Sequence, residues 1–163
     1  MSEAIPVNLT FSEMRIAVEV AAQRQCQNLR NGRHHRYGLS GEEGWTPHIE
    51  GACGEMAVAK YLGIYWSGSL GDLKAKDVGE FQVRTASNHD YRLILHEADK
   101  DDGVFLLVTG VAPELMLRGW IVARDGKKPE NWSDPKGGRP AFFVPQIALH
   151  PMTEFHAALR DDF

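Results

Sequence analysis

The segment KDVGEFQVRTA, residues 76–86 of a chain of 163 residues, gives the strongest indication of the fold. Apolar residues at positions 81 and 83 alternate with Gln82 and Arg84, and this period of two predicts a β-strand over Phe81–Thr85. The apolar side chains should face a core, so that Gln82 and Arg84 emerge together on the opposite face. Asp77 lies just before the strand and is separated from it by a predicted turn.

A helix predicted upstream of this stretch carries an unexpected carboxylate. Thr46 can cap the helix and Pro47 can start it, which predicts a helix over 47–62 that ends at Gly63. At about 100° per residue, one face is a stripe of small and apolar residues that a single carboxylate interrupts. The stripe consists of Gly51, Ala52, Glu55, Ala59 and Leu62. Because a buried carboxylate is costly without a cation or hydrogen-bond donors, we expect Glu55 to face the interior and to have such a partner.

The rest of the chain shows one more helix and several short strands. Thr10 and Glu13 have the spacing of a capping box, and the apolar repeat after them predicts a helix over 11–30. Further apolar runs predict strands that form an antiparallel meander with the first one: Arg92–His96, Val104–Thr109 and Leu115–Val122. A long surface loop over Arg124–Pro140 should precede a last strand, Ala141–Val144, and short helical turns.

The length and composition are those of one α/β domain. With 43% apolar and 25% charged residues the chain is not disordered, and we expect a single domain with a central mixed β-sheet flanked by helices. It divides into an N-terminal helix and loop (1–46), a core (47–123) and a C-terminal extension (124–163). No apolar run suits a membrane span and no signal peptide is evident, so we expect no membrane partner and a cytoplasmic location. The net charge of −4 means that any contact with DNA must be local.

Taken in order, an inward-facing Glu55 on a helix, then Asp77, then a strand with two polar side chains resemble the PD-(D/E)XK nuclease superfamily. The resemblance covers residues 47–123 and rests on the segments GACGEMAVAKYLG, KDVGEF and FQVRTA. The same segments, together with RLILHEADKDDGVFLLVTG and GRPAFFVP, are similar to bacteriophage or prophage proteins assigned to that superfamily. The resemblance implies a restriction-endonuclease-like core and a phage or prophage protein that acts in the cytoplasm of a bacterial host.

The same resemblance implies a metal-dependent phosphodiesterase that cleaves DNA. Its catalytic residues would be Glu55, Asp77, Gln82 and Arg84, and the first three of these would be the metal ligands. The expected cofactor is Mg²⁺ or Mn²⁺, since one or two carboxylates and a substrate phosphate are enough to hold a hard ion. Such an ion activates water, and a nearby cation supports the charge that develops on the phosphate. DNA is the expected partner, and the sequence is compatible with a homodimer.

Two positions depart from the superfamily pattern. Gln82 stands where an acidic residue is usual, so it offers a ligand oxygen without charge and metal affinity should fall. Arg84 stands where lysine is usual, and because it stays protonated we expect an electrostatic clamp on phosphate and not a base. A second hypothesis is therefore a catalytically weakened or inactive nuclease fold that serves as a DNA-binding or phage-assembly module. Asp72 is an alternative to Asp77 for the aspartate role.

Two charged stretches outside this constellation have two interpretations each. The first helix ends in a basic stretch that is either a solvated helix end or an arm that contacts DNA phosphates; its arginines are Arg30, Arg33 and Arg36. A run of acidic residues is foremost the turn of a hairpin, although it could attract a divalent cation: Glu97, Asp99, Asp101 and Asp102. The acidic run lacks the spacing of an EF-hand loop.

Overall fold

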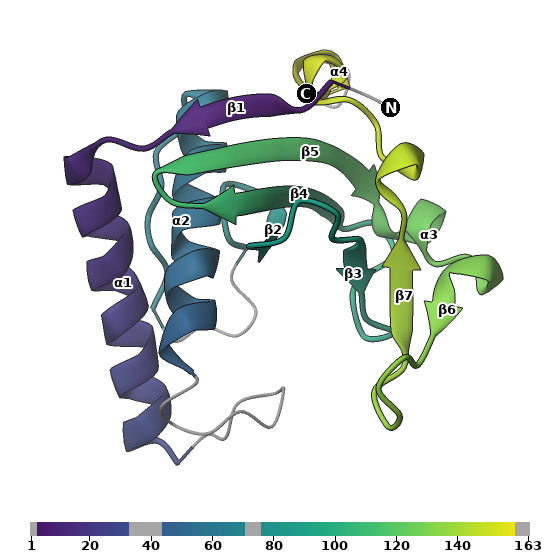
Figure 1. Ribbon diagram of the computed structural model, residues 1–163, viewed down its shortest axis with the longest axis horizontal. Coiled ribbons are helices and arrows are strands. Elements are labelled where there is room, and N and C mark those ends of the chain that lie inside the picture. The colour runs from purple at the N-terminus through teal and green to yellow at the C-terminus, as the bar shows by residue number, and fades with distance from the viewer. Residues whose placement is uncertain (1–2, 33–43, 71–75, 159–163) are drawn as a thin grey trace.

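The computed structural model describes residues 3–32, 44–70 and 76–158, and Figure 1 shows two long helices at one end of a curved sheet and a smaller sheet at the other end. The helices are α1 (Phe11–Arg30), α2 (Trp45–Leu62), α3 (Ala123–Gly126) and α4 (Met152–Ala158). The strands are β1 (Ile5–Asn8), β2 (Gln82–Ala86), β3 (Leu93–Leu95), β4 (Val104–Val111), β5 (Glu114–Val122), β6 (Trp132–Ser133) and β7 (Ala141–Val144). Short 3₁₀ turns cover Pro129–Asn131 and Gln146–Ala148.

The strands form two sheets. In the larger sheet the order is β1-β5-β4-β2, with β2 parallel to β4 and the other neighbours antiparallel. The smaller sheet has the order β3-β7-β6 and is antiparallel. The expected mixed sheet is confirmed, but the predicted antiparallel meander is wrong, because β3 leaves the first sheet and pairs with β7. The chain therefore crosses over through the second sheet between β2 and β4, and such a crossover lets the two strands run parallel.

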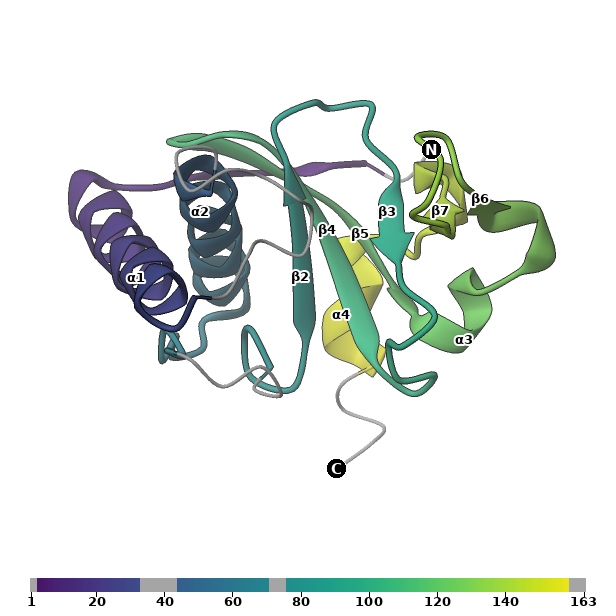
Figure 2. The same cartoon turned by 90° about the horizontal axis from the view of Figure 1, so that it is seen from below.

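The two faces of the larger sheet are covered by different layers. Side chains alternate along β4, so that Leu106 and Val108 belong to one buried cluster and Phe105 and Leu107 to another. The first cluster includes side chains of α1, α2 and α4, and the second includes side chains of β3 and β7. α2 and α4 therefore cover one face, α1 packs on the outside of α2 (Figure 2), and the small sheet covers the other face. The expectation that helices flank the sheet is confirmed for one face only.

Local sequence signals set the ends of the two long helices. Thr10 Oγ1 accepts a hydrogen bond from the Glu13 backbone N–H (3.3 Å), and Glu13 Oε2 accepts one from the Thr10 N–H (2.7 Å), so the predicted capping box is confirmed. α2 begins at Trp45, two residues earlier than predicted, and Gly44 before it offers no side-chain cap. It ends as predicted at Gly63, whose φ of +67° suits glycine. None of the helices in the described ranges is long and apolar enough to cross a membrane.

Three further segments differ from the sequence-based expectation. β1 was not predicted, and it extends the sheet by pairing with β5. The stretch 124–140 is not one loop, because most of α3, a 3₁₀ turn and β6 lie within it. The acidic run 97–102 is not the turn of a hairpin, because the strands on either side of it belong to different sheets. It connects the two sheets and passes close to β2, where Asp99 meets Arg84.

Candidate functional site

Glu55 of α2 is buried, as predicted, and its carboxylate meets Arg24 of α1. The guanidinium binds it through two hydrogen bonds, Nη1 to Oε1 at 2.8 Å and Nη2 to Oε2 at 2.9 Å. Trp66 Nε1 donates a third hydrogen bond to Oε2 at 2.9 Å, and Arg24 Nε donates to the Ser69 carbonyl at 3.0 Å. The expected partner for a buried carboxylate is therefore present, and both oxygens of Glu55 are engaged.

Arg24 was missed at the sequence level although the signal was present. Ala17 and Ala21 form the buried side of α1. Seven residues correspond to about two helical turns, so Arg24 falls within about 20° of Ala17 on that same side. The helical count that identified Glu55 on α2 would have placed a cation on the facing side of α1.

Asp77 lies at the outer edge of β2, the last strand of the sheet. A tight turn precedes the strand: Val78 and Phe81 pair with each other, and Gly79 between them has a φ of +54°, a conformation that favours glycine. This turn folds the chain back so that Asp77 Oδ2 accepts a hydrogen bond from the Val83 backbone N–H at 2.7 Å. The turn predicted from the sequence is thus confirmed, and it fixes a carboxylate beside the strand.

The pKa of Asp77 is raised from 3.8 to about 6. Burial is the main cause and the negative charge of Glu55 is the second, while the hydrogen bond from Val83 and the charges of Arg84 and Arg24 act in the opposite direction. Burial lowers the pKa of Arg24, but its hydrogen bond and charge interaction with Glu55 and the charge of Asp77 raise it more. Two carboxyl groups and two guanidinium groups therefore interact around the edge of β2.

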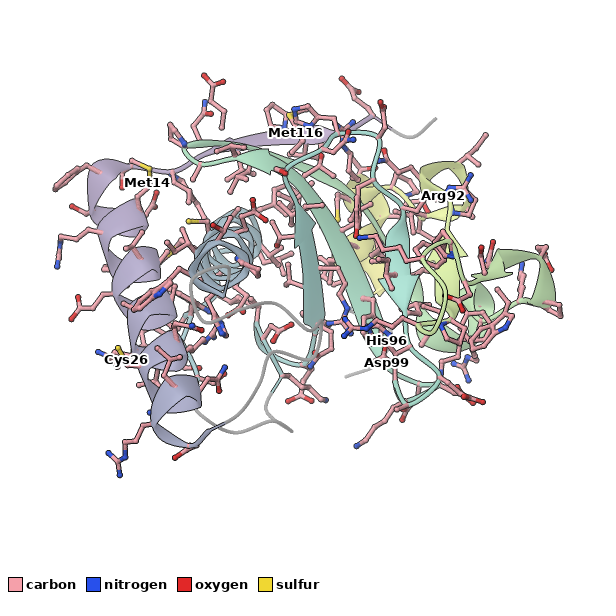
Figure 3. The ribbon with its side chains drawn as sticks, turned by 60° about the horizontal axis from the view of Figure 1, so that its bottom comes forward. Met14, Cys26, Arg92, His96, Asp99 and Met116 are labelled. Atoms are coloured by element: carbon pink, nitrogen blue, oxygen red, sulfur yellow. The ribbon has the colours of Figure 1, made fainter. Side chains whose placement is uncertain are left out.

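Gln82 and Arg84 project from the face of β2 opposite Val83, as the alternation predicts. Arg84 Nη2 lies 3.2 and 3.3 Å from the two carboxylate oxygens of Asp99, and its guanidinium carbon lies 4.9 Å from the centre of the Phe105 ring. Asp99 Oδ2 also accepts the His96 backbone N–H at 2.8 Å, and Figure 3 shows these two residues beside each other. Asp99 was assigned to a turn from the sequence, and no local signal distinguished it from its acidic neighbours.

A groove of about 610 Å³ opens between β2 and the second sheet, on the side of Arg84. Its cationic and anionic side chains are Arg84, Lys136, Arg139 and Asp99, and its aromatic side chains are Tyr91 and Phe143. Gln82, Ile94, His96, Ala98, Pro135, Pro140 and Ala141 complete the lining. Three basic side chains against one carboxylate make this groove locally positive in a chain of net charge −4. Such a groove suits an anionic ligand with a planar group.

The remaining predicted residues lie apart from this site or outside the described residues. Arg30 is exposed at the last turn of α1, and α2 lies between that helix and β2 (Figure 2). Arg33, Arg36 and Asp72 fall outside the described residues. Lys127 Nζ binds the Asp101 carboxylate at 2.8 Å, so this part of the acidic run already has a cationic partner.

The donors around Asp77 suit a hard divalent cation in kind. Asp77 and Glu55 are carboxylates, and Gln82 supplies a neutral oxygen further along β2, although Glu55 already uses both oxygens on Arg24 and Trp66. Within the described ranges, no group of three or more His, Cys, Asp or Glu side chains is placed to hold a metal ion. A cation beside Asp77 would offset the burial and the negative charge that raise its pKa. If an ion binds beside these donors, Asp77 would be its main ligand, because both oxygens of Glu55 are already engaged by Arg24 and Trp66.

Comparison with known proteins gave no relative: no family model, no curated protein and no solved structure matches the chain.

Proposed function

We propose that this protein is a metal-dependent phosphodiesterase that acts on DNA, with Mg²⁺ or Mn²⁺ held mainly by Asp77. The observation that carries the proposal is the position of Asp77 at the edge of β2, within the electrostatic reach of Glu55 on one side and Arg84 on the other. A carboxyl group that is buried and next to another carboxylate is destabilised when it ionises, and a bound cation removes that penalty. Perturbed groups of this kind cluster at functional sites.

Each residue of the site has a distinct role in this proposal. Asp77 and Glu55 would hold the ion, with the Gln82 carbonyl oxygen as a neutral ligand, and the bound ion would supply an activated water molecule. Arg84 would bind the phosphate oxygens through its planar guanidinium and neutralise their developing charge. It cannot accept a proton at any relevant pH, so it has no role as a base. Arg24 would orient Glu55 from behind and is a positioning residue.

A second candidate function, binding of DNA without cleavage, is favoured by one contact. The double hydrogen bond between Arg24 and Glu55 already neutralises the carboxylate that a metal ion would need. Arg84 and the cations of the groove would still bind phosphate in such a protein. The phage-assembly module considered from the sequence belongs to this second candidate.

A cleavage assay separates the two candidates. Plasmid DNA and single-stranded DNA are incubated with the protein and Mg²⁺ or Mn²⁺, and strand breaks are followed on gels. We expect cleavage that is stronger with Mn²⁺, since Mn²⁺ binds such donors more tightly. At subsaturating metal, activity should rise as the pH passes through about 6, where Asp77 of the metal-free protein loses its proton and can accept the ion.

Three variants complete the assay. Asp77→Asn should abolish cleavage, Gln82→Glu should strengthen it by adding a charged ligand, and Asp102→Asn, which changes an exposed carboxylate, is the matched control. If the wild-type protein and Gln82→Glu are inert with both metals and both forms of DNA, the hydrolytic proposal is wrong and the binding function takes its place.

A further inference from the structure

The loops that line the groove beside Arg84 are held in place by hydrogen bonds between polar side chains and the backbone. Its first wall carries Tyr91, which is 42% exposed and lines the groove. Gln146 Nε2 donates hydrogen bonds to the backbone carbonyls of His89 (2.7 Å) and Tyr91 (2.8 Å). One side chain thus ties the segment between β2 and β3 to the 3₁₀ turn that follows β7, so the Tyr91 ring extends from a backbone that is held in place.

The other two walls are fixed in the same way. Asp134 accepts the backbone N–H of Arg139 at 3.1 Å and so closes the turn between β6 and β7 that presents Lys136 and Arg139. Lys127 Nζ, almost covered by its surroundings, binds the backbone carbonyl of Asp99 and holds the connection that carries this carboxylate. The groove is therefore bounded by three loops, each fixed by one polar side chain.

One donor of the Arg84 guanidinium makes no hydrogen bond. Its Nε atom is buried and has no partner, and Nη2 divides its bonding between the two oxygens of Asp99 at 3.2 and 3.3 Å. An orphaned buried donor costs about 1–3 kcal/mol. Because Nε is covered, a ligand reaches it only if the guanidinium turns away from Asp99 into the groove. A phosphate would then accept from Nε and Nη2 together, the geometry that arginine prefers.

We propose that this groove receives one unpaired nucleotide of a DNA strand, with its phosphate on Arg84 in place of Asp99 and its base stacked on Tyr91. The inference rests on the proposed action on DNA and names the form of DNA that the site accepts. The groove volume of about 610 Å³ lies in the range of about 300–1,000 Å³ that is typical of small-molecule pockets. A base inside a duplex has both of its faces stacked on neighbouring pairs, so only an unpaired base can offer one to a tyrosine ring. Lys136 and Arg139 would contact the adjoining phosphates.

The test measures binding without metal, so that cleavage does not interfere. Fluorescence anisotropy in EDTA compares a labelled strand of about 15 thymidines with a duplex of the same length. We expect the strand to bind about tenfold more tightly than the duplex, and Tyr91→Ala to remove about tenfold of the strand affinity, since stacking on an aromatic side chain is sequence-tolerant and strong. Tyr65→Ala, which removes a 90% exposed aromatic side chain that does not line the groove, is the matched control and should change nothing.

Charge variants test the exchange at Arg84. Asp99→Asn keeps an oxygen for the His96 N–H and removes the charge that competes with phosphate, so it should tighten strand binding severalfold. Replacing Lys136 and Arg139 by Ala should reduce the salt dependence of strand binding by a slope of about 0.7 for each lost phosphate contact. The control pair, Arg124→Ala with Lys128→Ala, removes two exposed cations outside the groove and should leave the slope unchanged.

The outcomes distinguish this inference from the proposed function. Equal affinity for strand and duplex, or a silent Tyr91→Ala, overturns the inference even if the protein cleaves DNA. Selective strand binding without cleavage under any metal supports the inference and rejects the hydrolytic proposal. A uridine RNA strand that binds more tightly, or thymidine monophosphate that competes as well as the whole strand, overturns the choice of a DNA strand.

Discussion

Replacing Asp77 by asparagine should make the protein more stable at neutral and alkaline pH. The folded-state pKa of Asp77 is about 6, above the ordinary value of 3.8 that applies to the unfolded chain. The folded state therefore holds this proton more tightly, and its contribution to stability is present below about pH 4 and is lost as the pH rises through about 6. The difference between the folded-state and unfolded-state pKa of Asp77, at about 1.4 kcal/mol for each pKa unit, corresponds to about 3 kcal/mol in the free energy of unfolding.

The amide group introduced by this substitution would mimic the protonated carboxyl group and still offer an oxygen to the Val83 N–H. Asp77→Asn should therefore equal the wild type near pH 4 and exceed it by up to about 3 kcal/mol near pH 8. Urea unfolding followed by tryptophan fluorescence across this range gives both free energies of unfolding. The difference between the two proteins is the quantity of interest, because Glu13 and Glu50 also have shifted pKa values.

Asp102→Asn, at an exposed position, is the control and should show no such growing difference with pH. If Asp77→Asn is no more stable than the wild type near pH 8, ionisation of Asp77 in the folded protein has no free-energy cost. A bound cation would then have no such cost to offset at Asp77, and the proposed metal site would lose its support.

Further variants test the pairing of Arg24 with Glu55 and the packing of α2 on β2. Arg24→Gln should lower the free energy of unfolding by about 3–5 kcal/mol, since it leaves the buried charge of Glu55 without its cation. The double variant with Glu55→Gln should recover part of this loss in denaturant titrations. No recovery would refute the ion pair between Arg24 and Glu55. Gly54→Ala would place a methyl group 1.9 Å from Thr85 Oγ1, and it should destabilise the protein by about 1–3 kcal/mol because it pushes α2 away from β2. Gly51 has open space around it, so Gly51→Ala should stabilise α2 by up to about 1 kcal/mol. Equal effects of the two substitutions on thermal unfolding would contradict this packing of α2 on β2.

The helices and strands that can be predicted from the sequence are those whose burial produces a clear pattern of apolar residues. α1 and α2 each bury one stripe and β5 alternates between buried and less buried residues, so apolar residues recur at helical or strand spacing; β4 is buried on both faces and shows a continuous apolar run instead. The capping box at Thr10 and the left-handed Gly63 mark helix ends by local chemistry alone. These signals act within a few residues, which is why they are visible in a single sequence.

The features that were missed depend on partners far along the chain. β3 consists of three apolar residues that could pair in either sheet, and its partner β7 lies almost 50 residues further on. The same holds at the site, where Arg24 and Glu55 are 31 residues apart and Arg84 and Asp99 are 15 apart. A sequence shows that a buried charge needs a partner, but the packing of α1 on α2 decides which residue supplies it.

Titration of Mn²⁺ into the protein, followed by calorimetry and by electron paramagnetic resonance, measures whether Asp77 holds a metal ion. The wild type should bind Mn²⁺ and release part of a proton near pH 6 but none near pH 8, because the ion displaces the proton of Asp77. Asp77→Asn should lose the binding and the proton release together, whereas Asp102→Asn should keep both. Wild-type protein that binds no Mn²⁺ at either pH, or an Asp77→Asn variant that binds it equally well, would contradict the assignment of a metal site to the edge of β2.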